Sequence, residues 1–271
     1  MRETLTPVER GFDMNKKVAS ALTLASLFVA LGAEAEPTLK FGVDPSYPPF
    51  EQKMPDGSLS GFDIDLGEAI CANLQVKCVW VEQNFDSMIP ALKARKFDAI
   101  LSAFSATPVR RQQVDFTNKI YVAPSALIAK TDSGILPGDD SLKGKSVGVI
   151  QGSLQEAYAK SEWAPKGARI QSYQTQDQIF QDLITGRLQA SFQAAVQGDI
   201  GLLQTPRGAG YAFAGPAITD KSIIGDGVAI GVRKGGDDLV QKINASIVAI
   251  RQSGEYDKIA SKYFSFNIYG D

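Results

Sequence analysis

The chain has 271 residues, of which 44% are hydrophobic and 21% charged, as is ordinary for a globular protein. Its length fits one large domain or two domains of about 110–120 residues. With 28 Lys and Arg residues against 30 Asp and Glu residues, the net charge of −2 argues against a surface that binds nucleic acid. The chain contains no histidine, so it has no Ser-His-Asp or Cys-His nucleophile, and neither a metal site nor another cofactor is expected.

The N-terminal segment is typical of an export signal rather than of a folded element. A basic start at residues 15–17 precedes an apolar run over residues 18–31, and small residues in A-x-A spacing follow at 33–35. The run is shorter than the roughly 20 residues that span a bilayer. We expect a signal peptide over residues 1–35, with Met14 as a candidate true start, and a mature chain in the periplasm. An uncleaved signal anchor is the alternative.

The only two cysteines, Cys71 and Cys78, lie seven residues apart, at the end of an expected helix and the start of an expected strand. In an oxidising compartment two cysteines this close are expected to form a disulfide bond. We interpret the pair as a local structural link and not as a catalytic pair.

The apolar spacing predicts strands that alternate with helices, which is typical of βαβ units and a largely parallel sheet. The expected strands cover residues 38–43, 76–81, 97–101, 146–150, 170–173, 188–192 and 228–232. The expected helices cover residues 62–73, 86–92, 153–160, 175–186, 197–204, 237–253 and 255–264. A Pro-Asp-Gly turn at residues 55–57 predicts a hairpin, and Asp63 or Asp65 is the expected N-cap of the first helix.

Residues 100–112 combine the features of an anion site. An apolar strand runs into a hydroxyl-rich corner that begins at Ser102, and Pro108 and Arg110 follow at the start of a short helix. Unpaired N–H groups at a helix start attract negative charge, and arginine matches a carboxylate with two donors. The alternative is a surface turn with solvated arginines. Because ligands of such sheets bind beyond the carboxyl ends of the strands, Asp44 and Tyr47 are expected on the same rim.

A second junction of this kind follows the strand at residues 146–150. Gly152 permits a tight turn and Ser153 is a favourable N-cap for the next helix. The backbone N–H groups of this turn form a second candidate anion cradle. An ordinary capped helix is the alternative.

Several ordered segments resemble the polar amino-acid-binding proteins of bacterial ABC importers, and most of all the histidine- and lysine/arginine/ornithine-binding members. These segments are FGVDPSYPPFE (41–51), GFDIDLGEAIC (61–71), IPALKARKFDAILS (89–102), RRQQVDFT (110–117), SLKGKSVGVIQGS (141–153), GRLQASF (186–192), SGEYDKIASKYF (253–264) and FNIYG (266–270). They extend over nearly all of residues 36–271. Those relatives also have a cysteine pair at the positions of Cys71 and Cys78.

The resemblance implies the type II periplasmic binding protein fold, an α/β fold with two lobes. Each lobe would be a mixed sheet flanked by helices, and two hinge strands would join them. Lobe 1 would combine residues 36–122 with 224–271, and lobe 2 would cover residues 123–223. The implied protein is a monomeric, non-enzymatic solute-binding protein that delivers its ligand to an ABC permease in the inner membrane.

The resemblance also assigns roles around the ligand. Arg110 would bind the ligand carboxylate, together with backbone donors at Ser105, Ser153 and Leu154. Asp44 would bind a cationic side chain, and Tyr47 and Phe85 would clamp the ligand stem by stacking and cation–π contact. Ser102, Ala103 and Ala194 complete the predicted set.

Two positions depart from the family pattern. Ala194 stands where cationic amino-acid binders have an Asp for the ligand's α-ammonium, and Ala103 stands where they often have a second Ser. The first hypothesis is a cationic amino acid (arginine, lysine, ornithine or histidine), with Ser102, Ser105 or Gln193 partly replacing the missing carboxylate. The second is an opine of the octopine or nopaline type, because its α-nitrogen is substituted.

An enzyme of the same fold is the alternative from a different class of function. Relatives of these binding proteins include periplasmic dehydratases that act on cyclic acids and need a carboxylic acid–base group in the cleft. Asp44 and Glu51 are the candidate groups in the first half, and neither has an evident partner in the sequence. A role in presenting a liganded form to a membrane sensor is compatible with binding.

Overall fold

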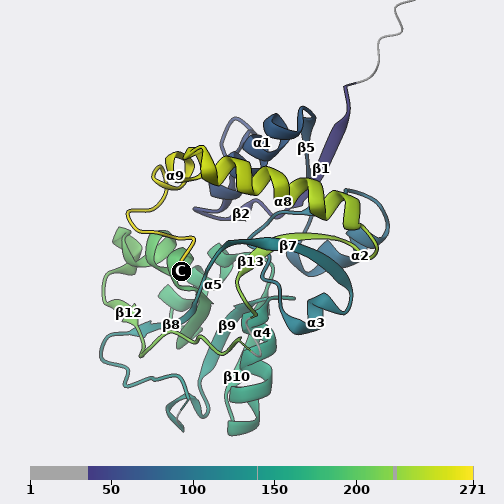
Figure 1. Ribbon diagram of the computed structural model, residues 1–271. Helices are drawn as coiled ribbons and strands as arrows, with labels where there is room; N and C mark the ends of the chain where they lie inside the picture. Colours follow the sequence, from purple (N-terminus) through teal and green to yellow (C-terminus); the bar gives the residue numbers. More distant parts are fainter. Residues whose placement is uncertain (1–35, 139, 222–224, 271) are drawn as a thin grey trace, which may run out of the picture. The chain divides into compact units, whose positions relative to one another are not determined.

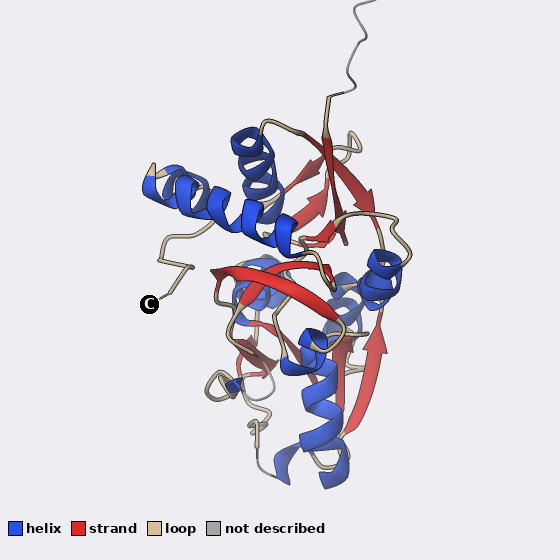
Figure 2. Ribbon diagram, turned by 45° about the vertical axis from the view of Figure 1, so that its right-hand side comes forward, coloured by secondary structure: helices blue, strands red, loops and turns tan. Residues whose placement is uncertain are grey.

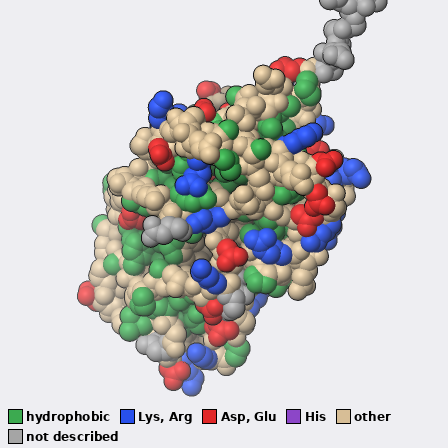
Figure 3. Space-filling view, viewed as in Figure 1, with side chains coloured by type: hydrophobic (Ala, Val, Ile, Leu, Met, Phe, Trp, Pro, Cys, Tyr) green, Lys and Arg blue, Asp and Glu red, His purple; other side chains and the backbone are tan. Residues whose placement is uncertain are grey.

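The computed structural model describes residues 36–138, 140–221 and 225–270. The predicted export signal over residues 1–35 lies outside the described residues. None of the helices in the described part of the chain is long and apolar enough to cross a membrane. On the face shown in Figure 3, Lys and Arg side chains are interspersed with Asp and Glu side chains.

The first sheet contains five strands in the order β5-β1-β6-β13-β7. Strand β1 pairs in parallel with β5 and β6, whereas β13 is antiparallel to both of its neighbours. The strands are β1 (Thr38–Val43), β5 (Lys77–Glu82), β6 (Ala99–Ile100), β7 (Val114–Tyr121) and β13 (Val228–Arg233). Strand β13 therefore returns, more than 100 residues after β7, to complete a sheet that begins at the N-terminal end of the described chain (Figure 1).

The second sheet also has five strands, in the order β10-β9-β11-β8-β12. Strand β9 is parallel to β10 and β11, while β8 is antiparallel to β11 and β12. The strands are β8 (Ser125–Lys130), β9 (Ser146–Ile150), β10 (Arg169–Tyr173), β11 (Ala190–Ala194) and β12 (Tyr211–Phe213). Both sheets are mixed, and helices flank them in both views (Figures 1 and 2), which confirms the predicted α/β class.

The predicted hairpin is part of a small third sheet. Strands β2 (Ser46–Tyr47), β3 (Glu51–Lys53) and β4 (Leu59–Ser60) pair antiparallel in that order. Gly61 follows with φ 137°, and a Cβ there would lie 2.2 Å from the Phe50 carbonyl oxygen. Only glycine can come this close to the Phe50 backbone. This close contact places the start of the first helix next to β3.

Helices α1 (Phe62–Leu74) and α8 (Asp237–Gln252) pack against each other and against the first sheet (Figure 1). The remaining described helices and helical turns are η1 (Phe85–Ser87), α2 (Met88–Lys93), α3 (Pro108–Arg111), η2 (Asp140–Leu142), α4 (Leu154–Tyr158), η3 (Ala159–Trp163), η4 (Ala164–Lys166), α5 (Gln176–Ile184), α6 (Ala195–Gly198), η5 (Asp199–Leu203), η6 (Pro206–Gly208) and α9 (Glu255–Ala260). In α5, Thr175 and Gln178 form a capping box, which fixes the start of that helix.

Two predicted helix starts are wrong. The N-cap of α1 is Gly61, and Asp63 and Asp65 both lie inside the first turn. Asp63 is fully buried, and its carboxylate accepts a hydrogen bond from the Ala103 N–H (2.7 Å) instead of capping its own helix. Asp86 likewise lies within η1, and Ser87 precedes α2.

A cluster of buried aromatic rings holds the C-terminal helix against the first sheet. The Phe50 ring stacks on Tyr121 at 5.1 Å between centroids, and Phe62 meets Tyr121 edge-on at 5.4 Å. Tyr256 of α9 meets Phe62 at 5.8 Å, and its hydroxyl donates to the Ile120 carbonyl (2.6 Å). Aromatic pairs of this kind add about 0.5–1.5 kcal/mol each beyond their buried area. The cluster fixes the positions of β3 and the start of α1.

Cys71 at the end of α1 and Cys78 in β5 form a disulfide bond, as predicted. The bridge ties the helix to the edge strand of the first sheet. Neither cysteine lines the pocket described below, consistent with a structural role.

Candidate functional site

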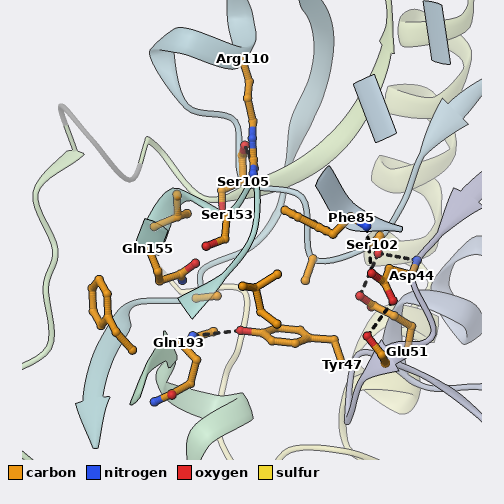
Figure 4. A pocket seen from close by; sticks show the side chains of 17 residues that line it. Asp44, Tyr47, Glu51, Phe85, Ser102, Ser105, Arg110, Ser153, Gln155 and Gln193 are labelled. Carbon is orange, nitrogen blue, oxygen red and sulfur yellow. Dashed lines mark hydrogen bonds between the residues drawn. The ribbon is translucent and has the colours of Figure 1, made fainter. Parts of the chain in front are cut away.

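A pocket is lined by 17 residues that come from the carboxyl ends of strands in both large sheets, from the helical segments that follow them and from the small third sheet (Figure 4). All ten residues of the predicted ligand site line it: Asp44, Tyr47, Phe85, Ser102, Ala103, Ser105, Arg110, Ser153, Leu154 and Ala194. The other seven are Ser46, Glu51, Ala123, Ile150, Gln155, Phe192 and Gln193. That these residues bind a ligand stays a prediction.

Asp44 follows β1 and is held in place by three hydrogen bonds. Its carboxylate accepts from the Ser46 hydroxyl (2.7 Å) and from the Phe85 N–H (2.9 Å), and its own N–H donates to Ser102 Oγ (3.0 Å). Burial raises the pKa of Asp44, while the hydrogen bonds from Ser46 and Phe85 oppose that rise. The carboxylate is therefore positioned in advance to meet a cation in the pocket.

Arg110 is the only arginine or lysine that lines the pocket, and it is 7% exposed. Thr107 caps the short helix α3 by accepting from the Arg110 N–H (3.3 Å). The guanidinium lies 4.1 Å from the Phe104 ring centroid and 5.2 Å from that of Phe85. These rings and the helix turn fix its direction into the pocket.

The guanidinium of Arg110 bonds only to neutral groups. Nη1 donates to the Ser105 carbonyl (3.0 Å), and Nη2 donates to the Gly152 carbonyl (3.1 Å). No ion pair among the described residues includes Arg110. Burial lowers the pKa of Arg110 to about 9, so the group is still charged at pH 7. A buried cation without a counter-ion is costly, and this one is suited to an incoming anion.

Tyr47 and Ala194 join the two sides of the pocket. The Ala194 N–H, at the end of β11, donates to the Tyr47 hydroxyl oxygen (3.0 Å). Burial raises the pKa of Tyr47, which keeps the phenol neutral. Ala194 brings no carboxylate to this position, and the neighbouring Gln193 uses its amide nitrogen on the Ala126 carbonyl (3.0 Å).

Ser153 is the N-cap of α4, as predicted, and its hydroxyl accepts from the Glu156 N–H (3.0 Å). Its own N–H donates to the Ile150 carbonyl (3.2 Å), so this donor is engaged within the turn. Gln155, which the prediction omits, is 8% exposed and donates to Ser125 Oγ (2.9 Å). Gln155 directly follows Leu154 in the first turn of α4, so the same strand–turn–helix pattern that indicates Leu154 could have indicated Gln155 as well.

Several of the other lining residues carry no local signal of a binding site. Ile150, Phe192 and Ala123 are apolar residues at or beside strand ends, and their patterns look the same as those of any core strand. For Glu51 the sequence predicts only a candidate acid, because a carboxylate after a proline pair gives no sign of its burial. The structure places it in the pocket wall, where its Oε1 accepts from the Ser102 hydroxyl (3.0 Å).

The arrangement offers one cation, one ordered carboxylate, one further carboxyl group and several aromatic or apolar walls. In the described part of the chain, no group of three or more Cys, Asp or Glu residues is placed to hold a metal ion. Asp44 and Glu51 lie on the same side of the pocket, with Arg110 apart from them (Figure 4). This separation of charges suits a small molecule with a negative end and a positive end.

Residues 39–266 match the family described as bacterial extracellular solute-binding proteins, family 3. The lysine/arginine/ornithine-binding periplasmic protein of Escherichia coli is 46% identical over 260 residues, which cover 95% of this chain and 100% of that protein. The histidine-binding periplasmic protein of Salmonella typhimurium is 44% identical over 258 residues, which cover 94% of this chain and 99% of that protein.

A solved structure of an ancestral arginine-binding protein bound to arginine is also similar. Its TM-score is 0.78 at 34% identity, with 85% of this chain and 99% of that chain covered. The type II binding-protein fold that the resemblance implied is thus confirmed by the relatives and by the solved structure.

The hydrogen bonds of Ser102 give a first testable prediction. Substitution of Ser102 by Ala removes the acceptor of the part-buried Asp44 N–H and the hydroxyl donor to the buried Glu51 Oε1, so the free energy of unfolding should fall by about 1–3 kcal/mol. Urea denaturation of the ligand-free protein measures this change.

Ser105 provides the matched control, because it is also buried, lies in the same loop, and its hydroxyl makes no hydrogen bond to another described side chain or backbone group. Ser105→Ala should change stability by less than about 0.5 kcal/mol. Equal losses in the two variants would contradict the role assigned to the Ser102 hydroxyl.

Proposed function

Since the chain belongs to the bacterial extracellular solute-binding proteins of family 3, we propose that it binds a small polar amino acid or a derivative of one in the periplasm. The bound form would then dock on the permease of an ABC importer, with the binding protein acting as a monomer. The two relatives described above, which are 44–46% identical, are named as periplasmic binding proteins and not as enzymes, which speaks against the dehydratase alternative.

The observation that carries this proposal is the unpaired guanidinium of Arg110. A buried arginine whose two described hydrogen bonds go to carbonyl oxygens has capacity for a carboxylate, which every free amino acid provides. Charge-assisted hydrogen bonds to such a group contribute about 1.5–3 kcal/mol each. The α-carboxylate would lie between Arg110 and the turn at residues 152–154.

A positively charged side chain is the preferred partner for the other side of the pocket. The Asp44 carboxylate is ordered there, and the rings of Tyr47 and Phe85 flank the space between it and Arg110. Relatives that are 44–46% identical are named for lysine, arginine, ornithine and histidine. We therefore place arginine, lysine, ornithine and histidine first among the candidate ligands.

An opine is the second candidate, and Ala194 is the observation that favours it. The α-ammonium of a free amino acid needs an acceptor, and the side chains nearest to this position offer an amide and hydroxyl groups instead of a carboxylate. A substituted α-nitrogen carries fewer N–H donors, and the small Ala194 side chain leaves room for the substituent. Octopine retains the guanidinium that would meet Asp44.

Binding would close two lobes around the ligand. We propose lobe 1 at residues 36–122 with 224–271 and lobe 2 at residues 123–223, joined by two hinge strands. Two hydrogen bonds support a closed form, because Arg110 donates to Gly152 and Ala194 donates to Tyr47 across the pocket. A ligand that contacts both sides would shift the population toward this form.

Calorimetric titration of the purified protein tests the proposal and separates its two candidates. We expect arginine, lysine, ornithine or histidine to bind, with octopine and nopaline weaker by at least about tenfold. Tight binding of an opine with weak binding of free arginine would select the second candidate. Failure of every amino acid and opine in the panel would refute the proposed function.

Replacement of Arg110 by Met should weaken binding of the tightest ligand at least about 30-fold, because the ligand carboxylate loses its charged partner. The control is Arg111→Met, which removes the neighbouring arginine, whose guanidinium lies over Phe116 at the exposed end of α3. The same calorimetric titration measures both. Near-normal affinity in Arg110→Met would contradict the role of this residue.

Gly152→Ala should also weaken binding, here by hindering closure. Gly152 has φ +74°, and a Cβ there would lie 2.7 Å from Asp86 Cα, across the pocket opening. We expect affinity to fall about tenfold as the closed population shrinks. Gly186→Ala is the matched control, because Gly186 has φ +80° but no atom within 4 Å of an added Cβ. It should keep normal affinity, and equal losses would reject the closure argument.

A further inference from the structure

Two buried acidic residues, Glu51 and Asp63, take no part in the ligand contacts proposed above. Glu51 is the first residue of β3, lines the pocket and is 1% exposed. Asp63 lies in the first turn of α1 and is fully buried. Neither residue takes part in an ion pair among the described residues.

The surroundings of this pair favour one proton between them. Glu51 Oε1 accepts from Ser102, and Asp63 Oδ2 accepts from the Ala103 N–H, so the two carboxyl groups are held by consecutive residues of one loop. Glu51 Oε2 and Asp63 Oδ1 are buried and have no donor among the described residues. Two ionised carboxylates buried together without further donors or a cation are costly, so we infer that one of the two is protonated.

Glu51 is the residue that holds the proton. Burial raises the pKa of Asp63 to about 7, while the Ala103 N–H and the first turn of a helix favour its carboxylate and limit that rise. Burial and the neighbouring charge of Asp63 raise the pKa of Glu51 well above its usual range.

The other ionisable groups near the pair do not neutralise it. Asp44, beyond β1, adds a further negative charge, while Tyr121 of β7 and Tyr256 of α9 are buried phenols whose pKa values are raised by burial. Arg110, the one cation of the pocket lining, bonds to Ser105 and Gly152 instead.

We propose that Glu51 is a specificity residue whose proton is displaced by a ligand with a positively charged side chain. The proton leaves the Glu51 carboxyl for the solvent, and the resulting carboxylate faces the cation together with Asp44. A ligand of the same shape with a neutral side chain leaves the proton in place. This inference rests on the proposed binding of an amino acid or opine in the pocket.

Charge balance gives the physical reason. Arg110 would neutralise the ligand carboxylate and Asp44 one positive group, while Ala194 supplies nothing for a second positive group. In a pocket closed to water, an unpaired charge is expensive, and a nearby cation lowers the pKa of a carboxyl group by about 1–3 units. Ionisation of Glu51 supplies the missing negative charge from the same side of the pocket as Asp44.

The test compares arginine with citrulline, which has the same length but a neutral side chain. Titration calorimetry at pH 6 to 7 in two buffers of different ionisation enthalpy counts the protons released on binding. We expect arginine to release up to about one proton more than citrulline, and the ratio of their affinities to rise by up to about tenfold per pH unit. Octopine, which has the same guanidinium, replaces arginine if it is the tighter ligand.

Glu51→Gln keeps the size of the side chain and removes the titrating group, so it should abolish the difference in proton release. Glu82→Gln is the control, because Glu82 is exposed on β5 and pairs with Lys53. If Glu51→Gln does not fold, infrared difference spectra of the wild-type protein replace it. They should show loss of a protonated carboxyl band on addition of arginine and not of citrulline.

Equal proton release with the two ligands, or an unchanged difference in Glu51→Gln, would overturn the inference. Binding of arginine without excess proton release would leave the proposed function intact and reject only the role of Glu51. Failure of all the amino acids and opines to bind would reject both.

Discussion

The site depends on a buried guanidinium that the protein leaves without a counter-ion. Arg110 lies between two aromatic rings and donates to carbonyl oxygens that belong to opposite sides of the pocket. Burial of an uncompensated charge costs free energy, and the fold bears this cost in the ligand-free state. An anion that offsets the cost gains affinity because the cation is already desolvated and oriented before the ligand arrives.

The acidic side of the pocket differs from the arginine side, because its charge can change by protonation. The Asp44 carboxylate is oriented by two donors, whereas Glu51 and Asp63 are buried side chains that each keep one carboxyl oxygen without a donor among the described residues. The pocket thus has a fixed positive charge at one side and an adjustable negative charge at the other. Such a site can adapt its charge to the ligand without moving its backbone.

Local sequence patterns were sufficient to predict Ser153 as a helix N-cap and Arg110 in a short helix after a strand end, whereas the ligand role of Arg110 came from the family resemblance and stays a prediction. They could not predict the position of β13, since its antiparallel pairing with β6 and β7 depends on a return of the chain after more than 100 residues. Asp63 was mistaken for a helix cap, because the sequence does not show that the Ala103 loop would lie against it. Burial by distant segments is the information that a local pattern lacks.

The two hydrogen bonds that cross the pocket use main-chain atoms on the side of the second sheet. The Gly152 carbonyl accepts from Arg110, and the Ala194 N–H donates to Tyr47. Side chains of the second sheet can therefore vary during evolution without loss of these two hydrogen bonds across the pocket. A substitution that alters ligand preference, such as the loss of a carboxylate at residue 194, can occur there while Arg110 and Tyr47 stay the same.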